Sequence, residues 1–315
     1  MRPRRISTQV SGRGCELRFS IVSGPDGECV VLRVLSKGPH DTNLRDLGLG
    51  SDQLTQFFRC INRPHGLVLA CGPKGSGKST TLYASLKSIQ RPDRKLMTIE
   101  DPIEYRLPGI VQVDVSQEKN HPSYSAGLRE LLKHDPDVIL VGEIRDGETA
   151  ELSVHAALVG HLVLSTLCSF DAVGIIDRLR DYGLKDRNVA SSLTGGVAQR
   201  LARRVCPNCA EDVLPSMARM ELLARHGQTS AELRHGRGCK ECAETGFKGR
   251  LGIYEVLEVS ETTRELIKAG ANELEVARAS RAAGMRTLLE DALSKSAAGL
   301  IPFDEVERLC MLTLS

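Results

Sequence analysis

A glycine-rich segment of the chain carries residues suited to holding phosphate. Gly72-Pro73-Lys74-Gly75-Ser76-Gly77-Lys78-Ser79 fits the P-loop pattern, in which two glycines precede Lys and a hydroxyl residue. Glycines let consecutive backbone N–H groups converge on phosphate oxygens, and a following helix points its positive dipole end at them. Lys78 is predicted to contact the β- and γ-phosphates of a bound nucleotide, and the Ser79 hydroxyl to help hold Mg²⁺. The predicted nucleotide-binding residues are Gly72, Pro73, Lys74, Gly75, Ser76, Gly77, Lys78, Ser79 and Thr80.

Two groups of acidic residues follow apolar segments further along the chain. The apolar run Val138–Val141 is followed by Gly142 and Glu143. An aspartate usually stands where Gly142 does, so the task of orienting and deprotonating an attacking water is assigned to Glu143. The second group predicts a metal or water site, with solvated loop acids as the alternative. It consists of Glu100, Asp101 and Glu104.

Four of the ten cysteines form two C-x-x-C pairs, Cys206 with Cys209 and Cys239 with Cys242. Two intervening residues let both sulfurs of a pair reach one tetrahedral ion at about 2.3 Å, and four thiolates favour a closed structural Zn²⁺ site. A redox C-x-x-C is the alternative, but it does not explain why there are two pairs. The other six cysteines are predicted to be small buried apolar residues. They are Cys15, Cys29, Cys60, Cys71, Cys168 and Cys310.

The overall composition excludes several classes of protein. The 315 residues include 42 Lys and Arg against 40 Asp and Glu, a net charge of +2, with no Trp and 3% aromatic residues. Scarce positive charge and scarce stacking rings therefore argue against a protein whose main role is to bind a nucleic-acid backbone. No apolar run approaches the roughly 20 residues that cross a bilayer, so no transmembrane segment is expected. The basic N-terminus lacks the apolar core of a secretory signal, which favours a reducing, cytoplasmic location.

The spacing of apolar residues indicates how the chain is organised. Residues 16–21 and 29–35 alternate as strands, and Ser23–Gly27 is typical of a hairpin turn. From about residue 44 to residue 170, short continuous apolar runs alternate with helical segments, which is typical of a parallel sheet covered on both faces. After Val259 the apolar spacing is helical.

Taken in order, the motifs resemble the type II secretion and type IV pilus assembly ATPases, in the secretion-ATPase branch of RecA-like P-loop proteins. The likeness extends from about Glu16 to the C-terminus. The matching segments are Pro64–Gly66, Gly72–Thr80, Thr98–Tyr105, Gly142–Asp146, Gly160–Leu167, Ala198–Leu201 and Gly249–Glu255.

The resemblance implies an α/β fold in four parts. These are a partial β-rich N-terminal subdomain (1–43), a RecA-like ATPase core (44–203), a four-cysteine zinc module (204–252) and a helical C-terminal region (253–315). It also implies a homo-hexamer that hydrolyses ATP at subunit interfaces, on the cytoplasmic face of the inner membrane. There it would drive assembly of pilin or pseudopilin subunits through an inner-membrane platform protein. The four-cysteine module is found in the assembly branch and generally not in the retraction ATPases.

Residue roles carry over from the same resemblance. Lys78 and Ser79 match the Walker A pair, and Glu143 matches the catalytic glutamate. Glu100 belongs to an acidic box that arranges metal and water, and His161 to a histidine box that senses the γ-phosphate. The last two matches are strand arginines that act as charge-stabilising fingers in the family, although solvated strand charges are an equal alternative. They are Arg18 and Arg33.

Three departures from the family pattern bear on activity. Cys168 stands where the second histidine of the histidine box is usual, and a thiol cannot replace an imidazole donor at neutral pH. Lys74 replaces a common Thr. Relative to the pattern, the chain also lacks an N-terminal adaptor domain and the first part of the adjoining subdomain. A nucleotide-binding remnant with weak turnover is therefore one alternative function, and a nucleic-acid-dependent P-loop motor is another.

Overall fold

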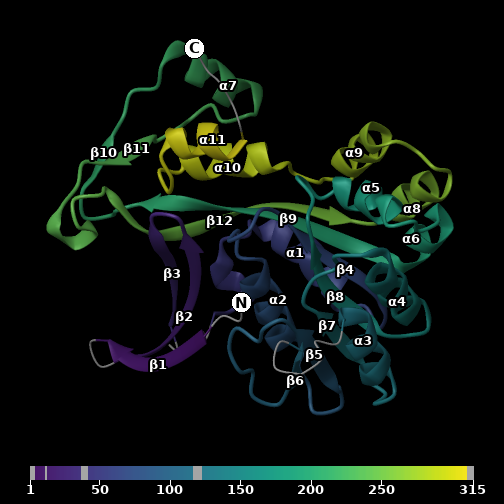
Figure 1. Cartoon of the computed structure of the whole chain (residues 1–315). Coiled ribbons are helices and arrows are strands. Elements are labelled where there is room, and N and C mark those ends of the chain that lie inside the picture. Colours follow the sequence, from purple (N-terminus) through teal and green to yellow (C-terminus); the bar gives the residue numbers. More distant parts are fainter. Residues whose placement is uncertain (1–3, 11–12, 37–41, 116–122, 311–315) are drawn as a thin grey trace. The chain divides into compact units, whose positions relative to one another are not determined.

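The computed structural model of the protein describes residues 4–10, 13–36, 42–115 and 123–310. The chain divides into two compact units, drawn together in Figure 1. One contains residues 1–42 and Glu104–Arg106, and the other contains Asn43–Ile103 and Leu107–Ser315. The first division lies one residue from the predicted boundary at 43/44.

The first unit contains an antiparallel sheet of three strands, in the order β1-β2-β3. Gly24 pairs with Gly27 at the end of the β2–β3 ladder, so the predicted hairpin is present. Arg18 on β2 lies directly opposite Arg33 on β3. The strands are β1 (Arg4–Val10), β2 (Arg13–Gly24) and β3 (Gly27–Ser36).

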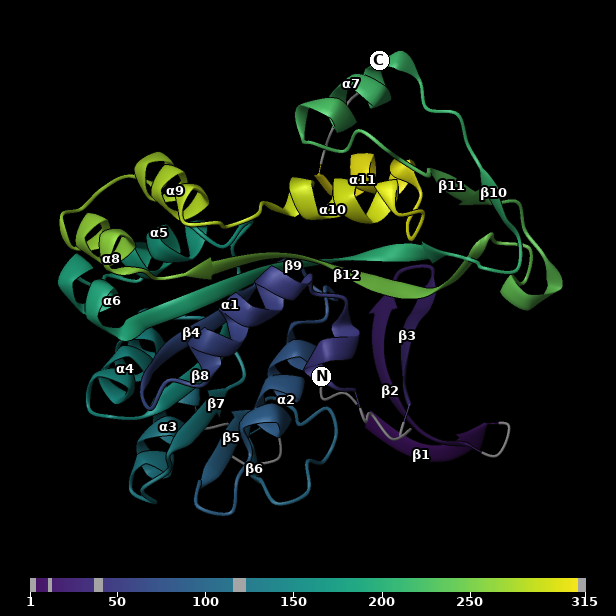
Figure 2. The same ribbon diagram turned by 180° about the vertical axis from the view of Figure 1, so that it is seen from behind.

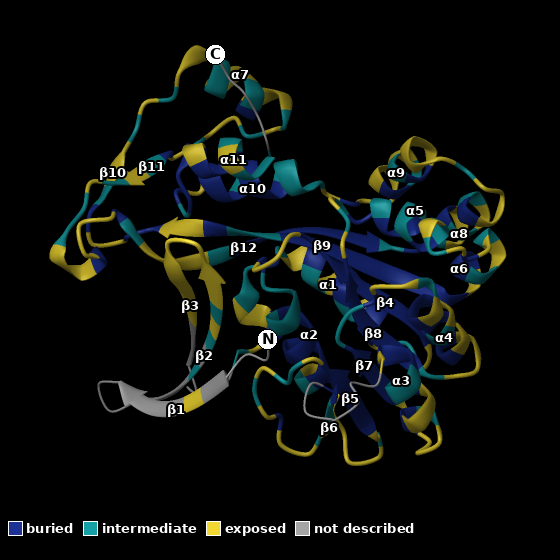
Figure 3. Ribbon diagram, viewed as in Figure 1, coloured by how far each residue is buried: buried dark blue, intermediate teal, exposed yellow. Residues whose placement is uncertain are grey.

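The second unit is built on a sheet of seven strands, in the order β12-β9-β4-β8-β7-β5-β6 (Figures 1 and 2). All neighbouring strands pair in parallel except β12, which runs antiparallel to β9. Strands β4, β5, β7 and β8 are buried along their whole length, as Figure 3 shows. This confirms the predicted α/β class with a parallel sheet. The strands are β4 (Gly66–Cys71), β5 (Leu96–Glu100), β6 (Val111–Asp114), β7 (Val138–Val141), β8 (Leu162–Leu167), β9 (Leu193–Val205) and β12 (Phe247–Glu258).

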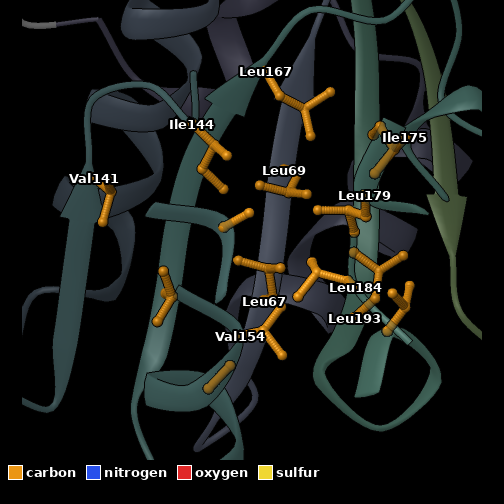
Figure 4. Packing of buried hydrophobic residues seen from close by; sticks show 14 of the residues in the cluster. Leu67, Leu69, Val141, Ile144, Val154, Leu167, Ile175, Leu179, Leu184 and Leu193 are labelled. Carbon is orange, nitrogen blue, oxygen red and sulfur yellow. The ribbon is translucent and has the colours of Figure 1, made fainter. Parts of the chain in front are cut away.

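The largest part of the core lies on one face of this sheet. Leu67 and Leu69 of β4 pack with Val154 of α4 and with Ile175 and Leu179 of α5 (Figure 4). Side chains of a strand alternate between faces, so the intervening residues of β4 point to the other face, where they are also buried. Helices α2 and α4 both contact β4, the strand that leads into the glycine-rich loop. The helices of this part are α1 (Ser51–Ile61), α2 (Lys78–Ile89), α3 (Tyr124–Leu132), α4 (Gly147–Leu158), α5 (Gly174–Asp181) and α6 (Asp186–Ser192), preceded by a short 3₁₀ helix, Leu44–Leu47.

The C-terminal third differs from the expected division into a module and a tail. The boundaries expected at 203/204 and 252/253 fall inside β9 and β12, which pair with each other in the main sheet. The cysteine segment therefore extends from the ends of two sheet strands. Cysteine and glycine spacing marks the loops around an ion, but it does not show where a strand ladder stops. The remaining elements are β10 (Ala210–Asp212), α7 (Met217–Arg225), β11 (Arg234–Gly236), η3 (Lys240–Cys242), α8 (Glu261–Lys268), α9 (Glu273–Ala282), α10 (Leu288–Ala297) and α11 (Phe303–Cys310).

Among the described residues, no helix is both long and apolar enough to cross a membrane.

Candidate nucleotide site and cysteine cluster

The glycine-rich loop connects the end of β4 at Cys71 to the start of α2 at Lys78. Gly75 and Gly77 have φ values of +79° and +94°, which side chains with a Cβ rarely adopt. The Lys78 ammonium donates hydrogen bonds to the carbonyl oxygens of Gly72 (2.8 Å) and Pro73 (3.0 Å). The structure thus supplies the strand, loop and helix that a phosphate cradle requires. Ser79 and Thr80 stand in the first helical turn, and Lys74 is exposed.

Glu100 is the last residue of β5 and is only 4% exposed. Its carboxylate accepts hydrogen bonds from the Tyr83 hydroxyl on α2, from Thr98 Oγ1 (2.6 Å) and from Gln112 Nε2 (3.2 Å). Burial with several donors means that Glu100 is not a solvated loop acid, whereas Asp101 and Glu104 are exposed, as the alternative expects. Through Tyr83, it also connects the acidic segment to the helix that begins at the P-loop lysine.

Glu143 lies two residues after β7, at the same edge of the sheet. Its Oε2 accepts a hydrogen bond of 2.7 Å from Arg145 Nε, and the Arg145 guanidinium also lies 3.6 Å from Asp101. The hydrogen bond to Glu143 raises the pKa of Arg145. The guanidinium lies 5.6 Å from the centre of the Tyr124 ring. One permanent cation therefore connects the carboxylates that follow β5 and β7.

Gly142, which stands where an aspartate is usual, lies close to Tyr124 and to the end of β5. A Cβ placed there would lie 2.9 Å from the Tyr124 hydroxyl, 3.3 Å from the Ile99 carbonyl oxygen and 3.4 Å from Glu100 Cα. The Gly142 N–H donates to that same carbonyl at 2.8 Å. A side chain at this position would therefore require Tyr124 and the end of β5 to shift, and the neighbouring strand β5 carries the carboxylate of Glu100.

His161 lies far from the P-loop of this chain, and its predicted role as a γ-phosphate sensor stays a prediction. His161 precedes β8, and Leu162 pairs with Gly66 at the start of β4, whereas the P-loop follows the end of β4. Six residues of strand separate the two edges, a span of about 20 Å. The ring donates from Nδ1 to the Pro136 carbonyl oxygen at 2.7 Å. It is Cys168 that follows β8 at the P-loop edge, with its Sγ 3.9 Å from Glu143 Oε1.

Arg18 and Arg33 belong to the first unit, so their predicted role as fingers remains a prediction. Sequence reasoning assigned no role to Tyr83, Tyr124 or Arg145. Arg145 lies within the quoted segment Gly142–Asp146, so its charge was the available signal. The two tyrosines reach the site only because α2 and α3 pack against the sheet, and no local pattern shows this.

The sulfur atoms of Cys206, Cys209, Cys239 and Cys242 all lie within 4.8 Å of one another. The Sγ–Sγ distances are 3.9 Å for Cys206–Cys239, 3.9 Å for Cys209–Cys242 and 3.7 Å for Cys239–Cys242. Four sulfurs placed tetrahedrally at about 2.3 Å from an ion are about 3.8 Å apart. The four thiols are free, and their spacing fits one tetrahedral ion better than two disulfides.

Backbone groups around the cluster favour the thiolate form of Cys242, whereas burial raises the pKa of Cys209 to about 12. The N–H groups of Cys239 and Gly246 each donate to Cys242 Sγ at 3.2 Å. Burial acts to raise the pKa of Cys242, but the hydrogen bonds that the sulfur accepts outweigh it and lower the pKa to about 6. Such donors orient and stabilise metal-binding sulfurs. Of the other cysteines, Cys60 and Cys71 are buried as predicted, whereas the prediction is wrong for Cys29 and Cys168, which are exposed. The Cys15 side chain lies outside the described residues.

Purified protein is expected to carry about one zinc per chain, and Cys239→Ser to lose it, because three thiolates no longer close the tetrahedral shell. Metal content after dialysis, measured by mass spectrometry, checks this. Cys29→Ser is the matched control, since Cys29 is also a free thiol but stands on β3, outside the cluster. Full zinc content in Cys239→Ser would contradict a four-cysteine site.

Fold and site together define a P-loop α/β protein with a four-cysteine cluster. The family model for "Type II/IV secretion system protein" matches residues 3–308, and the chain belongs to this family.

Relatives support the assignment. The chain is 42% identical to the type II secretion system protein E of Dickeya dadantii over 306 residues, covering 97% of this chain and 60% of that protein. It is 41% identical to the type IV pilus assembly ATPase PilB of Thermus thermophilus over 296 residues, covering 92% of this chain and 33% of that protein. The chain thus spans about 60% of the length of the type II relatives it matches.

Solved structures share the fold. The pilus retraction motor PilT, solved with bound ADP, matches with a TM-score of 0.70 and 26% identity, covering 97% of this chain and 77% of that one. The Legionella pneumophila ATPase DotB matches with the same TM-score at 20% identity, covering 98% of this chain and 77% of that one, which supports the fold alone.

Proposed function

We propose that this protein is an ATP-hydrolysing motor that powers assembly of pilin or pseudopilin subunits, for type II secretion or type IV pili. One observation carries the proposal. In a chain of the secretion family, the parallel strands bring the P-loop, Glu100 and Glu143 to one edge of the sheet. The carboxyl ends of parallel strands are where α/β proteins bind ligands.

Each residue at this edge of the sheet has a separate role in phosphoryl transfer to water. ATP with Mg²⁺, when bound, supplies the phosphoryl group. The loop amides and Lys78 hold phosphate oxygens, and the Ser79 hydroxyl would serve as a ligand of the cation. Glu143 orients the attacking water and accepts its proton. Buried Glu100 fixes polar groups around the same edge. Arg18 and Arg33 would complete the site as charge-stabilising fingers across a subunit interface.

Assembly and partners follow from the family relationship and the cysteine cluster. We propose a homo-hexamer that acts at the cytoplasmic face of the inner membrane on a platform protein. The cluster of Cys206, Cys209, Cys239 and Cys242, with Zn²⁺ as its ion, favours assembly of the fibre over retraction.

A second candidate function, nucleotide binding with weak turnover, is favoured by one observation: Cys168 occupies the place beside Glu143 where the family usually has histidine. If the missing imidazole limits turnover, Cys168→His is expected to raise the ATP hydrolysis rate by about tenfold or more, while Cys168→Ser leaves it unchanged. Phosphate release under saturating ATP measures the difference. Equal rates for both variants would show that this position does not limit the reaction.

The motor is tested by phosphate release together with the mass of the oligomer in solution. Single-stranded DNA is added in one arm and acidic phospholipid vesicles in another. We expect hydrolysis by a hexamer, without stimulation by DNA. Stimulation by DNA alone would indicate a nucleic-acid motor. Low rates from monomers that still bind ATP would indicate the weak-turnover function.

A further inference from the structure

Gln199 on β9 contacts the phosphate loop from the strand next to β4. Its side chain is 1% exposed, and its Nε2 donates a hydrogen bond of 2.7 Å to the carbonyl oxygen of Ser76. Ser76 is itself 3% exposed and precedes Gly77, the last residue before α2. A buried hydrogen bond therefore fixes the loop at the peptide that leads into the helix.

The backbone of Gln199 also contacts the start of the loop. A Cβ on Gly72 would lie 2.4 Å from the Gln199 carbonyl oxygen, and a Cβ on Gly77 would lie 3.0 Å from Gln199 Nε2. Both ends of the loop thus pack directly against one residue. Gln199 lies opposite Tyr254 in the ladder between β9 and β12. The conformation of the loop is therefore constrained at both ends by its contacts with Gln199.

The direction of the hydrogen bond determines what the loop presents to a ligand. In a trans peptide the C=O and the following N–H point in opposite directions. Because Gln199 holds the Ser76 carbonyl toward β9, the Gly77 N–H points away from β9. A phosphate cradle needs its N–H groups inward and its carbonyl groups outward, since a carbonyl oxygen repels phosphate.

Two buried polar atoms at this contact have no partner among the described residues, Gln199 Oε1 and Ser76 Oγ. Buried polar atoms in folded proteins are nearly always hydrogen-bonded, so an unpartnered pair beside a phosphate loop calls for an explanation such as a bound ligand, water or ion. If the contact served only the stability of the sheet, these atoms would be expected to have partners. Their lack of partners points to a loop whose hydrogen bonding is completed with nucleotide.

We propose that Gln199 is a positioning residue for the nucleotide: it orients the Ser76–Gly77 peptide so that the Gly77 N–H is directed at a phosphate. The inference rests on the proposed function and adds a residue to it. Gln199 does not contact the reacting atoms, and it acts through the loop. Its effect should therefore depend on the phosphates that the loop binds.

Gln53 on α1 provides a matched control. It is 2% exposed, and its Nε2 donates to the Tyr254 carbonyl oxygen at 2.7 Å, the same length as the Gln199 bond. Its Oε1 accepts from the Gly50 N–H at 3.0 Å. Both glutamines are buried and hold a backbone carbonyl, but only Gln199 holds one in the loop. Methionine matches glutamine in size and removes the donor in each case.

The test compares wild type, Gln199→Met and Gln53→Met in titrations with fluorescent ATP and ADP, each with a thermal unfolding curve. We expect Gln199→Met to bind both nucleotides about tenfold more weakly, the effect of losing one well-formed hydrogen bond to a charged group. Gln53→Met should lower the unfolding temperature at least as much and leave affinity unchanged. Gln199→Glu, which lacks the donor and brings negative charge near the phosphates, should also bind weakly, and it replaces Gln199→Met if that variant does not fold.

Wild-type affinity in a folded Gln199→Met or Gln199→Glu protein would overturn the inference while leaving the proposed function intact. Equal loss of affinity in Gln53→Met would also overturn it, because the effect would then be one of general stability. Failure of the wild type to bind either nucleotide would overturn the proposed function and the inference together.

Discussion

Glu143→Gln is expected to lower the rate of ATP hydrolysis by about 10²–10⁴-fold and to leave ATP binding intact. The amide keeps the shape of the side chain but cannot accept a proton from water, and general-base catalysis contributes about that much to rate. Binding should persist because the loop, Lys78 and the first turn of α2 are unchanged. Single-turnover phosphate release and a titration with fluorescent ATP measure the two quantities separately.

The control for this substitution is Glu130→Gln on α3. Glu130 is also paired with a cation, at 2.8 Å from Lys133 Nζ, as Glu143 is at 2.7 Å from Arg145 Nε. Glu130 is exposed on a helix, so its loss should leave the rate unchanged. A rate in Glu143→Gln within threefold of wild type would remove Glu143 from the chemistry, and Asp101, the other carboxylate beside Arg145, would then be the residue to replace.

The sheet could be predicted from sequence because its central strands are buried on both faces. Continuous apolar runs such as Leu67–Ala70 and Val138–Val141 have few alternatives to a parallel strand covered by helices. The P-loop could be predicted for a different reason: its glycines and lysine are contiguous in the chain, so the motif can be recognised without knowing the fold. The four cysteines were also predictable, because the spacing within each pair is set by the ion.

What the sequence did not show depends on distances across the fold. The histidine-box segment suggested His161 as a γ-phosphate sensor, but the length of β8 places that residue at the opposite edge and Cys168 at the site. The hydrogen-bond donors to the buried Glu100 carboxylate come from three different elements. One of these donors, the Tyr83 hydroxyl, belongs to a residue seventeen positions away in the chain. The same holds for Gln199, which reaches Ser76 only because β9 pairs with β4.

Lys78→Ala is expected to weaken ATP binding by about 100-fold and to abolish measurable hydrolysis. The ammonium is the charge that the P-loop pattern assigns to phosphate, and charge-assisted hydrogen bonds are the strong ones. The substitution also removes the hydrogen bonds from Lys78 Nζ to the carbonyl oxygens of Gly72 and Pro73, which stabilise the conformation of the loop. This defect differs from that expected of Glu143→Gln, which should bind ATP and cleave it slowly.

Substitutions of two further lysines test whether ATP affinity depends on the position of the Lys78 ammonium or only on positive charge. Lys95 at the start of β5 also donates to a backbone carbonyl, that of His134, but it lies at the amino edge of the sheet, so Lys95→Ala should bind ATP normally. Lys74→Thr removes an exposed cation from the loop itself and should weaken binding by only about threefold, because exposed charges interact weakly through water. If Lys74→Thr were as damaging as Lys78→Ala, the loop would be binding phosphate by general attraction rather than through one placed ammonium. If Lys78→Ala bound ATP like wild type, the glycine-rich loop would have no part in nucleotide binding.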